Sequence, residues 1–182
     1  MRSRAALTLL ALLVLAVPLS HLQLQQVDGR WLLAVDGRQV DVAGHASDRI
    51  NRMLRDCQDV RALDPQQPAH ARVAAALGQY SAPDSLDLRL VNLWQRGEWL
   101  LAEVEFKTLA PVVVVLHGGA ERVQVLAQGV WSGSTHPHWP APFIRHYLAS
   151  RVPEAPADLL ACFEPALPLF RSGRPPAPAS TG

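Results

Sequence analysis

The chain has 182 residues, of which 49% are hydrophobic and 18% are charged, and its formal net charge is +1. This length and composition are typical of one compact domain and exclude a chain that is disordered throughout. The near-neutral balance also argues against a nucleic-acid partner, because proteins that bind phosphate backbones gather a basic excess on one face.

The N-terminal residues have the pattern of an export signal. Arg2 and Arg4 precede an uncharged run of fifteen residues from Ala5 to Leu19. A charged start followed by an apolar stretch predicts secretion. The run is shorter than the ~20 residues that cross a bilayer, although an extension to Leu24 would reach that length. We therefore assign residues 1–26 to a signal peptide or an uncleaved membrane anchor, and expect a periplasmic or secreted protein, or one tethered to the inner membrane.

The two cysteines agree with export. Cys57 and Cys162 are the only cysteines, and they are separated by 105 positions. An even pair in an oxidising compartment predicts a disulfide. The alternative is two buried free thiols that pack as small hydrophobic side chains.

Two helices are predicted after a short hairpin. The run Arg30–Val42 has apolar segments on both sides of Asp36-Gly37, which predicts a tight turn between two strands. Ser47 is the expected cap of a first helix, whose core-facing residues at helical spacing are Ile50, Met53, Leu54, Cys57 and Val60. A second helix is expected to start at Pro68 and to pack beside the first as an antiparallel neighbour.

After the second helix, the spacing of the hydrophobic residues changes from the helical period to alternation. Residues 86–131 read as four strands of an antiparallel meander. In the second of these strands, Glu103 and Glu105 share a face that we expect to be solvated. The valine block at residues 112–115 lacks alternation, which predicts a strand covered on both sides or facing a curved interior.

The predicted fold is α+β. A further helix is expected at residues 141–150, and a Pro- and Ala-rich tail at residues 166–182 is predicted to be disordered. Residues 27–165 then form a single α+β domain in which the two N-terminal helices pack on a curved antiparallel sheet. At the level of architecture alone this arrangement resembles cystatin-like and NTF2-like rolls, and such a likeness carries no function.

His117-Gly118-Gly119 resembles the oxyanion loop of α/β-hydrolase esterases, in which a serine on a G-x-S-x-G turn is the nucleophile. Ser132, the nearby serine with flanking glycines, has the spacing G-x-x-S-G instead, and strand follows strand where the family alternates strands with helices. We interpret the glycines as a hairpin turn and assign no catalytic residue.

Metal binding has weak candidates in His136, His138 and His146, since imidazoles at this spacing can hold zinc or copper. No carboxylate or thiolate lies between residues 132 and 151 to complete such a site. We therefore predict no metal and no cofactor.

An aromatic loop is the strongest candidate for binding. Its candidate residues are Trp131, Trp139, Phe143, Arg145 and His146. Tryptophan gives a large contact area at low entropic cost, so an exposed loop of this kind suits a protein partner or a glycan. The alternative, which we favour, is a buried plug at the open end of the sheet. Arg145 then either clamps a carboxylate or caps the fold.

The functional hypothesis is a non-enzymatic protein-interaction module of the bacterial envelope. Its expected partner is another envelope protein, with the inner membrane as a second partner if the N-terminal segment is uncleaved. The alternative is a small-ligand-binding roll or enzyme with a cavity between helices and sheet, lined by Trp99, Phe106 and Val113.

Overall fold

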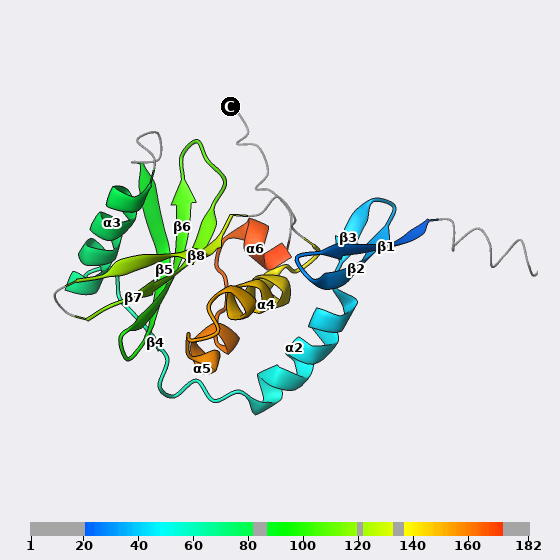
Figure 1. Cartoon of the computed structure of the whole chain (residues 1–182), viewed down its shortest axis with the longest axis horizontal. Coiled ribbons are helices and arrows are strands. Elements are labelled where there is room, and N and C mark those ends of the chain that lie inside the picture. Colours follow the sequence, from blue (N-terminus) through cyan, green and yellow to red (C-terminus); the bar gives the residue numbers. More distant parts are fainter. Residues whose placement is uncertain (1–20, 82–86, 120–121, 133–136, 173–182) are drawn as a thin grey trace, which may run out of the picture.

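The computed structural model of the chain describes residues 21–81, 87–119, 122–132 and 137–172. Within them the protein is α+β, as predicted, with two antiparallel sheets of strand order β1-β2-β3 and β4-β5-β6-β7-β8 (Figure 1). The strands are β1 (Leu22–Val27), β2 (Arg30–Val35), β3 (Arg38–Val40), β4 (Arg61–Ala62), β5 (Leu88–Arg96), β6 (Trp99–Phe106), β7 (Val112–His117) and β8 (Gln124–Trp131). The helices are α2 (Val42–Leu54), α3 (Pro68–Tyr80), α4 (Ala141–Arg151), α5 (Ala157–Ala161) and α6 (Pro168–Ser172).

Two Asp-Gly turns build the smaller sheet. Asp36 and Gly37 have φ values of 51° and 77° and connect β2 to β3, which confirms the predicted hairpin. Asp28 and Gly29 have φ values of 46° and 77° and connect β1 to β2 in the same way. A two-residue turn of this type needs positive φ at both positions, and Asp-Gly tolerates it. The smaller sheet therefore includes residues 22–26, which the sequence pattern assigns to a signal peptide or membrane anchor.

The larger sheet is covered on both faces. Its strands β5 to β8 are the predicted meander, and β4 adds a short edge strand. Successive side chains alternate between two hydrophobic cores: Leu101, Val113, Val115 and Trp131 enter one, and Leu100, Ala102, Val104, Val114 and Leu116 enter the other. The four central residues of β7, Val113 to Leu116, are buried on both faces of the sheet, which explains why the valine block lacks alternation.

The helices are arranged differently from the prediction. The sheet lies between α3 on one face and α4, α5 and α6 on the other (Figure 1). α3 packs against β5 and β8, but α2 packs against α4 and β2. The expectation that the two N-terminal helices pack side by side on one concave face is therefore wrong. The C-terminal helices take that place because their aromatic and aliphatic side chains are buried on the sheet: Phe143, Ile144, Leu148, Leu159, Leu160 and Phe170.

α2 is rotated relative to the prediction. Its N-cap is Asp41, whose Oδ1 accepts a hydrogen bond from the Gly44 amide at 2.8 Å, whereas the predicted cap Ser47 lies inside the helix. The buried residues of α2 are Gly44 and Asp48. The side chains predicted to face the core are exposed, by 60% for Ile50, 84% for Met53 and 78% for Leu54. The polar side of α2 thus packs on the protein, and its apolar side faces outward.

Glu103 is buried, which corrects the expectation of a solvated side chain. Its carboxylate accepts hydrogen bonds from the backbone amides of Ala166 and Leu167 at 2.8 to 3.1 Å, and from Asn92 Nδ2 at 2.9 Å. A buried carboxylate is tolerated where several donors satisfy it. The contact holds the start of the segment predicted as a disordered tail, and this segment continues into α6 with Phe170 fully buried. Residues 166–172 are therefore part of the folded structure, although the composition of residues 166–182 predicts a disordered tail.

The predicted disulfide is confirmed. Cys57 and Cys162 are bonded, with their Cα atoms 5.9 Å apart. The bond joins the chain just after α2 to the residue that ends α5. None of the helices within the described residues is long and apolar enough to span a bilayer.

The carboxylate of Glu103 can be tested by Glu103→Gln. The amide would turn an N–H group toward backbone N–H donors, so we expect the free energy of unfolding to fall by about 2 to 4 kcal/mol in urea denaturation. Glu105→Gln is the matched control, since Glu105 lies two residues along the same strand and its side chain is 40% exposed beside Arg89. The control should lose less than about 1 kcal/mol. Equal losses in both variants would refute the structural role of Glu103.

The disulfide can be tested by the double variant Cys57→Ala/Cys162→Ala. A covalent loop of 105 residues restricts the unfolded chain, so its loss should lower the free energy of unfolding by about 4 to 5 kcal/mol. The measurement is urea denaturation followed by circular dichroism, compared with the wild type before and after reduction. Reduced wild type and double variant should agree, because both lack the same constraint.

Candidate binding site

A buried ion pair joins α2 to α4. Arg145 Nη2 contacts Asp48 Oδ1, and Arg145 Nη1 donates to the Phe163 carbonyl at 2.5 Å. Arg52 Nη2 reaches the second carboxylate oxygen of Asp48 at 2.8 Å. Burial lowers the pKa of Arg145, and the negative charge of Asp48 opposes this shift. The pair explains the orientation of α2, because Asp48 has to face inward to meet the guanidinium.

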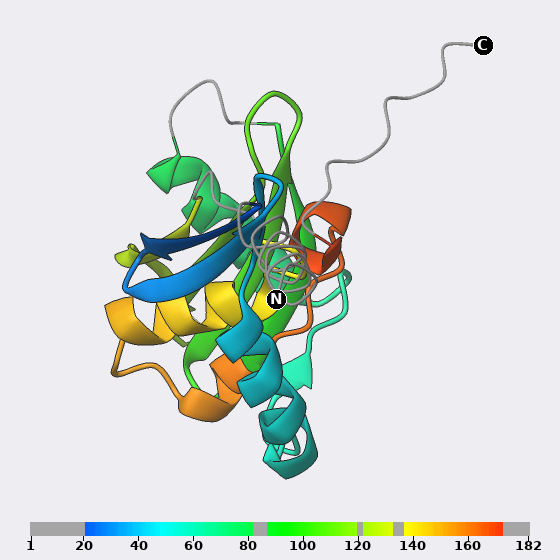
Figure 2. The same ribbon diagram turned by 90° about the vertical axis from the view of Figure 1, so that its right-hand side faces the viewer.

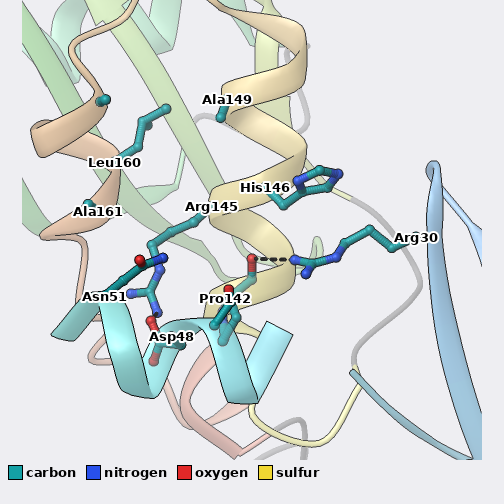
Figure 3. A pocket seen from close by; sticks show the side chains of 11 residues that line it. Arg30, Asp48, Asn51, Pro142, Arg145, His146, Ala149, Leu160 and Ala161 are labelled. Carbon is teal, nitrogen blue, oxygen red and sulfur yellow. Dashed lines mark hydrogen bonds and ion pairs between the residues drawn. The ribbon is translucent and has the colours of Figure 1, made fainter. Parts of the chain in front are cut away.

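One hollow, which we call the junction groove, lies beside this pair (Figure 3). Its volume is about 240 Å³, slightly below the range of roughly 300 to 1,000 Å³ found for small-molecule sites. The side of the groove formed by α2 is polar, and the side formed by α5 is mostly apolar. The residues that line it are Arg30, Ser47, Asp48, Asn51, Pro142, Arg145, His146, Ala149, Ala157, Leu160 and Ala161.

The charged groups of the junction groove are engaged with the protein. Arg30 donates to the Pro142 carbonyl at 3.3 Å, the contact dashed in Figure 3, and lies 3.2 Å from Asp41 Oδ2.

The pKa of His146 is lowered, first by partial burial of its imidazole and then by the positive charge of Arg30, while the negative charge of Asp41 opposes this shift. The imidazole of His146 is therefore neutral at neutral pH and can donate or accept a hydrogen bond.

A second cleft lies on the other side of Asp48. It consists of two adjoining hollows of about 290 and 510 Å³ that share His45, Asp48, Arg52 and Trp139. We call it the Trp139 cleft. Its remaining lining residues are Ala46, Arg49, Ala141, Pro142, Glu164, Pro165 and Arg171.

Trp139 is held at the surface by its own backbone. The residue is 54% exposed and has a φ of 52°, a left-handed conformation that is strained for a large side chain. The preceding residue, His138, fixes this geometry: its amide donates to the Gln39 carbonyl at 2.8 Å and its carbonyl accepts from His45 Nε2 at 2.9 Å. The indole stacks on the His138 ring with centroids 4.6 Å apart. An exposed tryptophan in a strained, fixed backbone is a feature typical of binding sites.

The Trp139 cleft has an excess of positive charge. Its two acidic residues are already paired, Asp48 with Arg145 and Arg52, and Glu164 with Arg55. Arg49 and Arg171 take part in none of the ion pairs that the described residues form. The cleft therefore suits a ligand that combines an apolar or flat group with a negative charge.

The predicted aromatic loop divides into buried and exposed parts. Trp131 and Phe143 are each 1% exposed and meet edge to face, with ring centroids 5.3 Å apart. Arg145 is 8% exposed and caps the fold through Asp48. Trp139 and His146 are the two candidate residues that face solvent. Trp131 and Phe143 are therefore buried, as the plug interpretation expects, whereas Trp139 is exposed.

The remaining candidates do not form a site. Val113 and Trp99 pack with one core and Phe106 with the other, so they do not line one cavity between helices and sheet. Gly118 has a φ of 143°, and its amide donates to the Glu98 carbonyl at 2.8 Å in the connection between paired strands β7 and β8. Gly118 and Gly119 lie in the connection between these antiparallel strands, and residues 120–121 of that connection lie outside the described residues.

The metal candidates are only partly covered by the structure. His136 lies outside the described residues. His138 Nδ1 accepts from Arg38 Nη2 at 2.9 Å, and His146 lines the junction groove. Within the described ranges no group of three His, Cys, Asp or Glu side chains is placed to hold a metal ion.

Several residues that line the junction groove and the Trp139 cleft were not predicted as site residues from the sequence. Asp48, Arg49 and Arg52 lie off the apolar stripe predicted for this helix, so the sequence indicates only a solvated helix face for them. The available signal was the spacing of Val42, Ala46, Ile50 and Met53, which gives α2 an apolar stripe whatever it faces. The position of that stripe relative to Arg145 depends on a contact between residues 97 positions apart, which local periodicity does not contain.

Comparison with known proteins gives no assignment, since no protein-family model, curated protein or solved structure matches this chain. The α2–α4 junction, with the junction groove and the Trp139 cleft beside it, is therefore the basis for a functional proposal.

The buried pair can be tested by removing one partner at a time. Asp48→Asn and Arg145→Met each leave an unmatched buried group, so we expect each to lower the free energy of unfolding by about 3 to 5 kcal/mol. The double variant Asp48→Leu/Arg145→Met should recover much of this loss. Arg52→Met is the control, because Arg52 is 58% exposed at its side chain and should lose less than about 1 kcal/mol. Additive losses in the double variant would show that the pair is not coupled.

Proposed function

We propose that the protein is an exported component of the bacterial envelope that binds another envelope protein rather than catalysing a reaction. Two observations support export. The sequence of residues 1–19 has the charged start and apolar run of a secretory signal. The Cys57–Cys162 disulfide is of a kind that persists in oxidising compartments such as the periplasm.

The observation that carries the binding proposal is the exposed indole of Trp139. Tryptophan and arginine are the residues most enriched among the hot spots of protein interfaces. Trp139 lies in a cleft that also contains Arg49, Arg52 and Arg171. The matching partner surface carries an apolar side chain that covers the indole, next to a carboxylate that meets the unpaired arginines.

The alternative function, binding of a small ligand, is favoured by one specific observation. Arg145 and His146 both line the junction groove, and the neutral imidazole of His146 is accessible there (Figure 3). Against it, Arg145 is already bonded to Asp48 and to the Phe163 carbonyl. A small ligand in this groove would therefore meet His146, Ser47 and Asn51 rather than a free guanidinium.

Trp139→Gly is the sharpest test of partner binding. Glycine accepts a positive φ without strain, so this variant removes the indole while the backbone conformation is kept. Tagged full-length protein is crosslinked in cells and purified from the envelope fraction, and the attached proteins are identified by mass spectrometry. We expect a partner that is lost with Trp139→Gly and retained with Leu109→Ala, a control at a 48%-exposed residue outside the cleft.

Two results would contradict the proposal. The same partner recovered in equal yield with Trp139→Gly would exclude the Trp139 cleft as the contact. Mature protein found in the cytosol with both thiols reduced would exclude export. Binding of a small molecule that protects His146 from modification, with no protein partner, would favour the alternative.

A further inference from the structure

The outward side of α2 is apolar and uncovered. Val42, Ile50, Met53 and Leu54 are between 55% and 84% exposed, although the helix concentrates its apolar residues on one side. Its single acidic residue, Asp48, is on the buried side and paired with Arg145. The outward side therefore carries apolar groups and arginines but no negative charge.

The smaller sheet extends this uncovered surface. Leu22 lies opposite Val35, Leu24 opposite Leu33, and Gln26 opposite Trp31, so these side chains share one face of the sheet. The opposite face contributes buried Leu32 and Ala34 to the interior. Large apolar side chains on the outer face are exposed, by 38% for Leu22, 64% for Leu24, 56% for Trp31 and 37% for Val35.

Exposed apolar residues are concentrated in this part of the molecule. Among the described residues, eleven large hydrophobic side chains are exposed, and eight of them lie between Leu22 and Leu54. We call these eight the outer apolar face: Leu22, Leu24, Trp31, Val35, Val42, Ile50, Met53 and Leu54. The smaller sheet and α2 lie on one side of the molecule, at the right of Figure 1 and toward the viewer in Figure 2.

We propose that the outer apolar face rests on a lipid bilayer with anionic headgroups, with α2 lying in the interfacial region. This inference rests on the proposed export, in the case in which the N-terminal segment stays uncleaved and anchors the chain in the inner membrane. The uncharged run of the sequence ends at Leu19, three residues before β1 starts at Leu22. A chain tethered through that run has its smaller sheet next to the lipid, whatever else it binds.

The composition of α2 favours lipid over a protein partner. Helices that lie in a membrane interface combine a strongly one-sided apolar distribution with low overall hydrophobicity and arginines beside the apolar side. α2 has all three features, with Arg49 and Arg52 exposed next to Ile50 and Met53. Trp31 on the neighbouring sheet is of the residue type enriched at bilayer interfaces. Arg49, which takes part in none of the ion pairs among the described residues, matches the negative charge of the headgroups.

The experiment uses the full-length chain reconstituted with vesicles of phosphatidylcholine and phosphatidylglycerol. Because both native cysteines are in the disulfide, Met53→Cys provides a single thiol for an environment-sensitive fluorophore. Leu109→Cys is the matched control, since Leu109 is 48% exposed and lies outside the outer apolar face. Flotation measures whether the chain is on the vesicles, and the emission maximum of the fluorophore measures whether that position is in lipid.

We expect the chain to float with the vesicles and the label at position 53, but not at position 109, to shift to shorter wavelength. Arg49→Glu should reduce the lipid-exposed fraction of the label at position 53 about fivefold or more, because each cation near an anionic surface strengthens the contact. This charge reversal leaves the buried Asp48–Arg145 pair in place. Vesicles of phosphatidylcholine alone should give a smaller shift.

Three results would overturn the inference, and they are distinguishable. If the chain floats but the label at position 53 keeps its emission in water, the tether stands and the face does not touch lipid. If the chain does not float, the proposed membrane location fails together with the inference. If the label at position 53 shifts without vesicles as the protein concentration rises, a second copy of the chain covers the face instead.

Discussion

The buried contact between Asp48 and Arg145 determines how the N-terminal third of the protein is oriented. A guanidinium and a carboxylate are stable inside a protein only when they meet each other and further hydrogen-bonding groups. Here the Phe163 carbonyl and Arg52 complete the set. With Asp48 turned inward, the apolar stripe of α2 has to point to solvent. The inward position of Asp48 between the junction groove and the Trp139 cleft, and the exposure of the apolar residues of α2, follow from this single orientation.

The same contact connects two regions with different roles in the fold. The core on both faces of the larger sheet is apolar and is formed by alternating strand residues. The α2–α4 junction is instead polar, and it is tied to the core by the disulfide and by Arg55, which bonds to the Ala161 carbonyl and to Glu164. The disulfide and the contacts of Arg55 thus fix the polar junction to the apolar core.

The sequence predicted those features that short-range chemistry controls. Alternation located strands β5 to β8, Asp36-Gly37 located a hairpin, and Pro68 located the start of α3. The cysteine pair was predicted correctly because the chain offers a single pairing. Asp28-Gly29 carries the same turn signal, but the assignment of residues 1–26 to a leader removed one of the two strands that flank it.

Other features depend on contacts between distant residues and were predicted wrongly. Glu103 on a strand beside Glu105 has the pattern of a solvated face, and its burial depends on the amides of Ala166 and Leu167. Trp131 and Trp139 are the same residue type in one sequence segment, so local pattern does not distinguish them, yet Trp131 is in the core and Trp139 is at the surface. For α2, periodicity gave the apolar stripe but not its direction, because the inward position of Asp48 depends on Arg145.

The long-range character of these contacts has a consequence for how the chain acquires its structure. Residues of the first two thirds of the chain form contacts with residues that are synthesised much later. These pairs are Asp48 with Arg145, Cys57 with Cys162, and Glu103 with Ala166. Synthesis is vectorial and releases the N-terminal part first. Until the last helices emerge, α2 has no partner for its polar side and the sheet lacks one of its covers. Contacts between residues so far apart in sequence slow folding, because the loop between them has to close before they form.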